Sequence, residues 1–283
     1  MRFLVITALL IVTACSPQRQ IYHSKAPEER AKFVADLFYQ PDDVPLPYRV
    51  WEPKEKKYKD KPKAVIIALH GFNDYSRAFE NSGPYFRDNG FVMYAYDQRG
   101  FGSSPYTGIW AGEDNLVHDL ANFVRVTSQR HPGAPVYILG ESMGGAVTIV
   151  ATSTPGFPKV DGVILVAPAV WGEDTMNPFY RMTLWMAAHT MPSYELTGSD
   201  LKIMASNNIP MLHRMARDPL VIKRTRVDAI YGIVKLMDKA YLNVPNMQVP
   251  VLMLYGSDDQ VIPPGPIKTA LERFTRPVQY VYY

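Results

Sequence analysis

The chain has 283 residues, of which 47% are hydrophobic and 20% are charged, a composition typical of a folded globular protein. Its net charge of +3 is too small to predict nucleic-acid binding, and no basic patch interleaved with aromatic residues indicates such a partner. The length allows one large α/β domain with an inserted subdomain. We find no His, Cys and acidic residues at metal-ligand spacing, so we expect neither a metal nor a cofactor.

The N-terminal segment has the pattern of a bacterial secretory signal. A positively charged start is followed by an apolar run from Phe3 to Val12, which is too short to span a bilayer. Val12-Thr13-Ala14-Cys15 resembles the lipobox of bacterial lipoproteins. The resemblance implies removal of residues 1–14, lipidation of Cys15 and, because Ser16 follows, anchoring at the outer membrane of the cell envelope. A plain signal peptide with an unrelated cysteine is the alternative.

Residues 15–40 are expected to form a tether that leads into a short helix. Pro27 and the two acidic residues after it suit a first helical turn. Apolar residues then follow at helical spacing: Phe33, Val34, Leu37 and Phe38.

Residues 41–167 are predicted to form the first part of an α/β core, in which apolar strands alternate with helices. The strands are expected at 46–51, 64–69, 91–96, 136–139 and 163–167, and the longer helices at 75–89 and 113–130. The strand at 64–69 is apolar throughout, as in a parallel sheet that is covered on both faces. The charged run from Lys54 to Lys63 predicts a solvated hairpin turn. The alternation predicts a mostly parallel, doubly wound sheet.

The alternation breaks over residues 168–249, where helical patterning continues without a clear strand. Nine of the thirteen methionines lie here, together with several aromatic residues. We predict a helical cap over the carboxyl ends of the strands. Its apolar side chains would either pack the cap onto the core or face an acyl chain. The core resumes over 250–283, with a strand at 251–255, a helix at 267–274 and a final strand from Val278.

The strongest signal is Gly140-Glu141-Ser142-Met143-Gly144, which lies between an apolar strand and a helix of small residues. A serine on such a sharp turn has a strained backbone, so the residues two positions away must be small. The hydroxyl then stands above the sheet edge, and the free N–H groups of the following helix point toward the same place. The pattern predicts a nucleophile elbow with Ser142 as the attacking residue.

With His70-Gly71 after a strand and Asp97-Gln98-Arg99-Gly100 after another, the elbow resembles the α/β-hydrolase family. Within it, the chain resembles the monoacylglycerol lipase and lysophospholipase branch, which includes sequences labelled serine aminopeptidase. The resemblance runs from about Leu46 to the end. It implies an α/β-hydrolase fold with an inserted helical cap, and an oxyanion hole formed by the backbone N–H groups of Phe72 and Met143. His70 would shape its loop and would not act as the base.

The same resemblance selects the acid of the catalytic triad. In Tyr255-Gly256-Ser257-Asp258-Asp259 the family places the acid third after the glycine, which favours Asp259 over Asp258, while an Asp-rich solvated turn remains the alternative. In the family the histidine follows the acid, but no histidine follows Asp259 in this sequence. Members continue past the last strand to a loop that carries this histidine, so we expect the base to lie beyond Tyr283.

The sequence therefore predicts a lipid-anchored serine hydrolase. It would cleave carboxylic esters of single-chain lipids, monoacylglycerols or lysophospholipids, through an acyl-enzyme on Ser142. A peptide or thioester bond stays open, because the geometry of the cap decides which acyl groups fit. The alternative function is a non-catalytic lipoprotein with an incomplete triad that binds a lipid or a protein partner.

Overall fold

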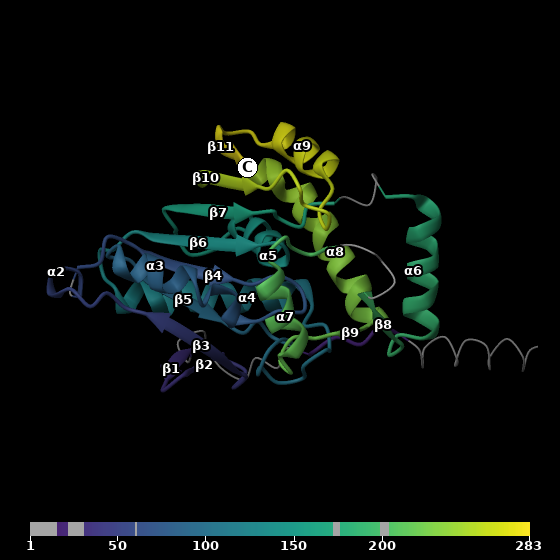
Figure 1. The fold of residues 1–283 in the computed structure, drawn as a ribbon, viewed down its shortest axis with the longest axis horizontal. Coiled ribbons are helices and arrows are strands. Elements are labelled where there is room, and N and C mark those ends of the chain that lie inside the picture. The colour runs from purple at the N-terminus through teal and green to yellow at the C-terminus, as the bar shows by residue number, and fades with distance from the viewer. Residues whose placement is uncertain (1–15, 22–30, 60, 172–175, 199–203) are drawn as a thin grey trace, which may run out of the picture.

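The computed structural model describes residues 16–21, 31–59, 61–171, 176–198 and 204–283, so the expected signal segment and Cys15 lie outside it. Its centre is a nine-stranded sheet in the order β1-β2-β3-β5-β4-β6-β7-β10-β11 (Figure 1). The strands are β1 (Lys32–Val34), β2 (Leu37–Tyr39), β3 (Pro45–Trp51), β4 (Val65–Leu69), β5 (Val92–Tyr96), β6 (Val136–Glu141), β7 (Gly162–Val166), β10 (Val251–Tyr255) and β11 (Val278–Tyr282). From β5 to β11 the neighbours are parallel. The predicted fold class is confirmed.

Helices cover both faces of this sheet. The helices of the core are α2 (Lys56–Lys59), the 3₁₀ helix η2 (Ser76–Phe79), α3 (Ser82–Asp88), α4 (Glu113–Arg130), α5 (Met143–Thr152) and α9 (Pro264–Arg273). On β4, Val65, Ile67 and Leu69 belong to the larger core, which includes side chains of α4 and α5. Ile66 and Ala68 belong to a second cluster with Phe79 of η2. This two-sided burial explains why β4 is apolar throughout.

The short helix expected from Pro27 to Phe38 begins outside the described residues, and its second part was predicted wrongly, because β1 and β2 form an antiparallel hairpin there. Phe33 lies opposite Phe38, with ring centroids 4.8 Å apart, and both rings contact Phe123 of α4. Ala35 adopts φ 52° at the turn. The apolar spacing suits a helix, but the aromatic partners on α4 favour two strands, since tertiary contacts override local propensity.

Two smaller expectations also need correction. The charged run at 54–63 contains the single helical turn α2 instead of a hairpin. The helix expected at 75–89 is divided into η2 and α3, although Gly90, with φ 87°, ends it as predicted. The helix predicted at 113–130 is confirmed at both ends.

The segment 168–249 forms a cap beyond the carboxyl ends of the central strands (Figure 1). Its elements are α6 (Pro178–Thr190), β8 (Glu195–Thr197), α7 (Ile209–Arg217), β9 (Arg224–Arg226), α8 (Val227–Asn243) and the 3₁₀ helix η5 (Val244–Asn246). The antiparallel pair β8–β9 contradicts the expectation of a cap without strands. Each of these strands has three residues and no apolar alternation, so the sequence carried no strand signal.

The second half of the expected cap belongs partly to the core. Leu236 and Ala240 of α8 are fully buried in the same cluster as Val147 of α5. Among the described residues, no helix is long and apolar enough to cross a membrane.

Candidate active site

Ser142 lies on the predicted elbow between β6 and α5. Its backbone has φ 49° and ψ −112°, a conformation that a non-glycine residue adopts only when its surroundings enforce it. The Ser142 N–H donates to the carbonyl of Val166 at 2.9 Å, and the Ser142 carbonyl accepts from the N–H of Ala169 at 2.9 Å. The loop after β7 therefore holds the strained residue in place.

The two glycines of the motif are required by close approach of the backbone. A Cβ at Gly140 would lie 2.5 Å from the carbonyl oxygen of Gly144, and a Cβ at Gly144 would lie 2.3 Å from that of Leu69. At Gly71 a Cβ would lie 3.5 Å from the Cβ of Ser142. The loop after β4 thus packs directly against the elbow.

The expected oxyanion donors lie on these two loops. Met143 is the first residue of α5, so its N–H has no acceptor within the helix. Phe72 follows Gly71, and its ring makes edge contacts with Phe101 and Trp110, at centroid distances of 5.7 and 6.3 Å. These contacts fix the backbone at Phe72 next to Ser142.

His70 holds the same loop from behind. Its Nε2 accepts the backbone N–H of Gln98 at 2.9 Å, so Nδ1 carries the proton and donates to the carbonyl of Gly71 at 2.8 Å. The Gln98 side chain donates to the carbonyl of His70 at 2.8 Å. Burial lowers the pKa of His70 to about 4, so the ring is neutral. Both ring nitrogens are occupied, which fits the expected role in shaping the loop.

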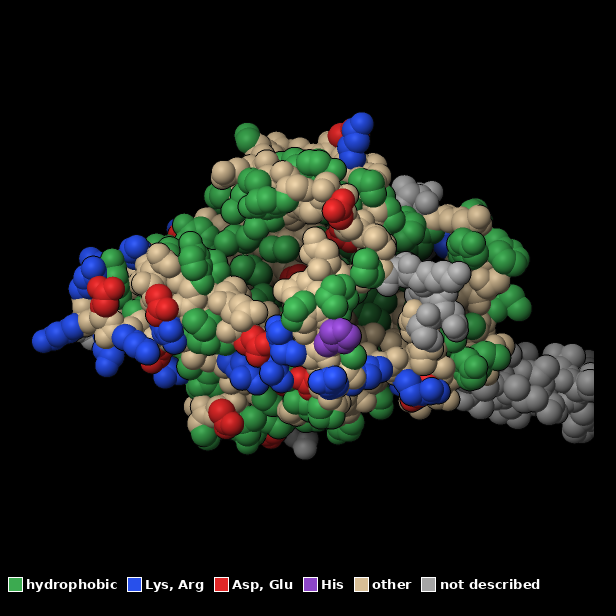
Figure 2. Space-filling model, in the orientation of Figure 1, with side chains coloured by type: hydrophobic (Ala, Val, Ile, Leu, Met, Phe, Trp, Pro, Cys, Tyr) green, Lys and Arg blue, Asp and Glu red, His purple; other side chains and the backbone are tan. Residues whose placement is uncertain are grey.

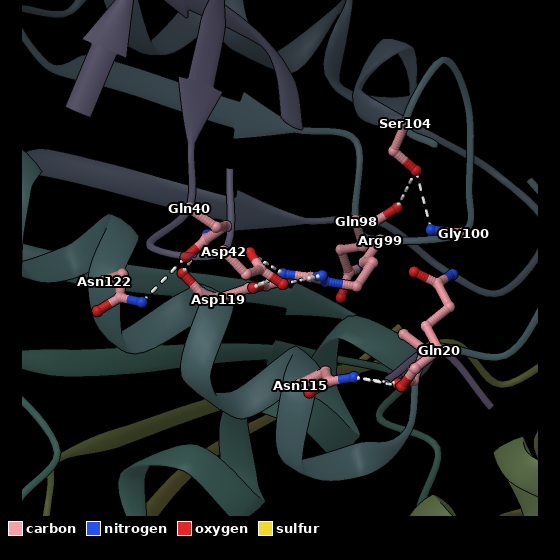
Figure 3. A network of polar contacts seen from close by, with 11 residues as sticks. Gln20, Gln40, Asp42, Gln98, Arg99, Gly100, Ser104, Asn115, Asp119 and Asn122 are labelled. Atoms are coloured by element: carbon pink, nitrogen blue, oxygen red, sulfur yellow. Dashed lines mark hydrogen bonds and ion pairs between the residues drawn. The ribbon is translucent and has the colours of Figure 1, made fainter. Parts of the chain in front are cut away.

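A buried ion-pair network fixes the loop after β5 that carries Gln98 (Figure 3). Arg99 donates to Asp42 at 2.7 Å and to Asp119 of α4 at 2.8 Å, and all three side chains are at most 2% exposed. The Ser104 hydroxyl donates to the carbonyl of Gln98 at 3.0 Å. Sequence reasoning missed Asp42 and Asp119, although an acidic residue on the apolar face of α4 is a signal that could have found the second.

A cavity of about 390 Å³ brings the predicted residues together. Ser142, Phe72 and Asp259 line it from three different loops, and Asp258 is not part of its lining. Asp259 lies after β10, where its Oδ1 accepts the N–H groups of Val261 and Ile262 at 2.8 and 2.9 Å. These bonds hold the carboxylate in a fixed turn at the cavity wall.

Four further carboxyl groups line the cavity, and sequence reasoning assigned none of them a catalytic role: Asp74, Glu80, Glu141 and Asp218. Figure 2 shows the hollow with acidic side chains inside it. Glu141 precedes the candidate nucleophile, and Asp74 lies on the loop after β4. Burial, with a smaller contribution from the charge of Asp74, raises the pKa of Glu141 to about 7. The wall beside Ser142 therefore carries a carboxyl group that is partly protonated at neutral pH.

The cap closes the cavity through α7. Met211 and Met215 of this helix line the cavity opposite the sheet. Asp218, just after α7, accepts from the Tyr75 hydroxyl at 2.7 Å and from Arg77 at 3.0 Å. We call Tyr75, Arg77 and Asp218 the cap latch, because they join the cap to the core at the cavity.

No histidine is among the described residues that line the cavity. His118, His131 and His189 occupy the surface or packing positions expected of them. His131 contacts the Tyr94 hydroxyl at 2.8 Å, and His189 stacks on Trp185 at 4.4 Å. Within the described ranges, no group of three or more His, Cys, Asp or Glu residues could hold a metal ion.

Several known proteins similar to this chain are named lipases or esterases. Residues 60–283 match the family described as serine aminopeptidase, S33. Human monoglyceride lipase is 28% identical over 224 residues, which cover 75% of this chain and 69% of the human protein. Monoacylglycerol lipase of Mycolicibacterium smegmatis is 23% identical, over 81% of this chain and 80% of that protein. The crystal structure of a monoglyceride lipase variant from Saccharomyces cerevisiae superposes with a TM-score of 0.71 at 20% identity, covering 94% of this chain and 89% of that one.

Proposed function

Because the chain belongs to the serine aminopeptidase S33 family, in its monoacylglycerol lipase-like branch of α/β-hydrolases, we propose that it hydrolyses esters through an acyl-enzyme on Ser142. The main support for this proposal is that Ser142, Phe72 and Asp259 line the same cavity. Asp259 would orient the general base and stabilise its charged form.

In the proposed reaction the base takes the Ser142 proton as Oγ attacks the ester carbonyl carbon. The carbonyl oxygen becomes an anion, and the N–H groups of Phe72 and Met143 would stabilise it, each by about 3 kcal/mol. The leaving alcohol takes the proton as its bond to carbon breaks. Water then attacks the acyl-serine in the same manner and releases the fatty acid.

We propose single-chain lipid esters, monoacylglycerols or lysophospholipids, as the substrates. Two relatives are named for monoacylglycerol hydrolysis. The cavity is lined by Met211, Met215 and Val221 of the cap, a flexible apolar wall that suits an acyl chain. A panel of monoacylglycerols, lysophospholipids, thioesters and peptides with varied acyl length would rank the substrates.

A fluorophosphonate probe tests the nucleophile directly. In a gene product that includes the general base, the probe should form an adduct on Ser142, located by peptide mass spectrometry, and Ser142→Ala should lower ester hydrolysis by about a millionfold. Ser128→Ala, on α4 and away from the cavity, is the matched control and should retain the activity. Hydrolysis by the Ser142→Ala variant at the normal rate would refute the assignment.

The general base is the open part of the proposal. Since no described histidine lines the cavity, we propose that a histidine beyond Tyr283 supplies it. The 283-residue chain should then turn over esters about a millionfold more slowly than a gene product that includes this histidine. Equal turnover by the two forms would contradict this part of the proposal.

Because no described residue of the cavity lining is a histidine, a second candidate is a lipoprotein that binds an acyl lipid without cleaving it. An active-site titration of the gene product that includes any residues after Tyr283 separates the two. A burst of product followed by turnover supports the enzyme, whereas stoichiometric lipid binding without product supports the binding protein.

We further propose that Cys15 anchors the protein to the bacterial outer membrane through acyl chains, since two or more chains give stable attachment. Metabolic labelling with a radioactive fatty acid should label the wild type and leave Cys15→Ser unlabelled. An unlabelled wild-type protein would refute the anchor.

A further inference from the structure

A short N-terminal segment, which we call the strap (residues 18–20), is bonded to the core and to the cap. At one end, the Gln20 N–H donates to the carbonyl of Trp110 at 3.0 Å, in the loop that leads into α4. At the other end, the Gln18 N–H donates to Oδ2 of Asp228 at 3.2 Å, in the first turn of α8. Both ends of the strap are therefore fixed to the folded body of the protein.

The cap end of the strap is held at a buried ion pair. The side chain of Asp228 is 0% exposed, and it accepts from Arg226 at 2.6 Å. The same guanidinium donates to the Gln18 side chain at 2.9 Å. Because hydrogen bonds to ionised groups are stronger than those between neutral groups, this end is a firm attachment point.

The core end of the strap supplies hydrogen bonds to an irregular loop. Residues 109–111 form this loop between Gly108 and Gly112, whose φ angles of 86° and 88° are typical of glycine. The Gln20 side chain donates to the carbonyl of Ile109 at 2.8 Å. A carbonyl in such a loop has no partner within a helix or a sheet, so the strap replaces the bonds that regular structure would supply.

Asn115, in the first turn of α4, connects the strap and the loop a second time (Figure 3). Its side-chain amide donates to the carbonyl of Gln20 at 2.9 Å and to that of Ala111 at 2.6 Å. The carbonyl groups of residues 109–111 are thus bonded either to the strap or to a side chain that also holds the strap. The conformation of the loop therefore depends on the strap.

Trp110 connects this loop to the candidate active site. Its ring is 1% exposed and makes an edge contact with the ring of Phe72, at a centroid distance of 6.3 Å. The ring also packs on α8, since a Cβ at Gly232 would lie 2.5 Å from it. Among the described residues, Nε1 of Trp110 has no hydrogen-bond partner, so packing and the loop backbone set the position of the ring.

We propose that the strap positions the oxyanion hole; the inference rests on the proposed function. The strap fixes residues 109–111, and Trp110 in turn holds Phe72 at the place where its N–H meets the ester oxygen. No strap residue is among the described residues that line the cavity, so the strap acts through the loop and not on the substrate. A small displacement of a donor is enough to lower the rate, because the charge develops at one place.

Kinetics of Gln20→Met test the proposal, with every protein prepared as the gene product that includes any residues after Tyr283. The substitution keeps the length of the side chain and removes the donor to Ile109. We expect kcat for an ester to fall about tenfold to hundredfold and KM to change less than about twofold, because the oxyanion forms only during the reaction. Gln129→Met makes the same change at an exposed position of α4 and should leave both constants unchanged.

Asn115→Ala tests the loop from its other side. Alanine favours a helix, so α4 should be retained while the bonds to Gln20 and Ala111 are lost. This variant should lower kcat in the same way as Gln20→Met. In the double variant the combined loss should be smaller than the product of the two single losses, because both act through residues 109–111. Multiplicative losses would contradict this shared route.

Hydrogen exchange separates positioning from global stability and needs no catalysis. In Gln20→Met the amide hydrogens of residues 108–111 and 71–74 should exchange faster, whereas those of β6 should exchange as in the wild type. The Asp74 N–H, which donates to the carbonyl of Gly71 at 3.3 Å, reports on the loop that carries Phe72.

The same measurement keeps the two proposals apart. A wild type that does not hydrolyse esters would refute the proposed function, while faster exchange at 71–74 in Gln20→Met would still support the role of the strap in ordering this loop. Unchanged exchange at 71–74 would overturn the inference. A lower free energy of unfolding with unchanged kcat would also overturn it, because the strap would then only stabilise the fold.

Discussion

The two sides of the cavity are held together by different kinds of contact. On the sheet side, Arg99 pairs with Asp42 and Asp119, and none of these side chains is more than 2% exposed. On the cap side, the pair Arg224–Glu195 between β9 and β8 is 65% and 45% exposed. A buried charge that loses its partner is costly, whereas an exposed pair contributes only about 0–1 kcal/mol. From these two pairs we infer that the sheet side is the rigid side, and that the cap around β8 and β9 rearranges at lower cost.

The largest effect should come from the buried network. Arg99→Ala leaves Asp42 and Asp119 without their partner and should lower the free energy of unfolding by about 3–5 kcal/mol. Arg224→Ala removes an exposed pair of the same type and should cost less than about 0.5 kcal/mol. Urea unfolding of both variants measures the difference. Similar losses in the two variants would show that the contrast between core and cap is wrong.

A second, smaller effect concerns Glu141, whose pKa is raised to about 7 by burial and by the charge of Asp74. Because the folded state holds this proton more tightly than the unfolded chain, its stabilising contribution is complete below about pH 4 and is lost as the pH rises to about 7. Glu141→Gln keeps the shape without the charge. Its stability should equal that of the wild type at pH 4 and exceed it by about 3 kcal/mol at pH 8.

Thermal unfolding followed from pH 4 to pH 8 measures this prediction. Asp74 and Asp119 also have raised pKa values. Both are present in the wild type and in the variant, so their own titration contributes to both stability curves and does not by itself create the difference. A constant stability difference across the pH range would mean that the Glu141 carboxylate is solvated in the cavity and not buried at its wall.

The sequence predicted well those elements whose burial depends on their own residue pattern. The helix at 113–130 and the strands at 64–69 and 251–255 were predicted closely. Each has a clear apolar pattern, and the apolar residues are buried in the core. The elbow was predictable because its requirement for small residues is local. The hairpin at 32–39 was missed because it depends on aromatic partners on α4.

Part of the site could not be predicted because it depends on contacts between residues that are far apart in the sequence. Asp42 acquires its role only where the fold brings it to Arg99, 57 residues away along the chain. Glu141 stands in the middle of the motif, but its raised pKa depends on burial and on Asp74 in another loop. β8 and β9 pair across 29 residues without an apolar pattern. Such contacts cannot be read from residue spacing.

The smallest effect should come from the cap latch. Asp218→Asn removes the ion pair with Arg77 and should cost about 1 kcal/mol or less, because Arg77 is 43% exposed. Its functional effect should depend on the substrate, since α7 carries Met211 and Met215 over the cavity. We expect KM for a long-chain ester to rise roughly threefold to fivefold, with little change for a short-chain ester that does not reach the cap.

Glu195→Gln is the control for the latch, because it breaks an exposed cap ion pair that does not line the cavity. It should leave KM unchanged for both esters. The comparison separates two ways in which the latch could act. A change confined to the long-chain ester means that Asp218 positions α7 against the acyl chain. An equal fall in kcat for both esters would mean that it acts through Tyr75 on the loop that carries Phe72, and the cap would then belong to the rigid side of the site.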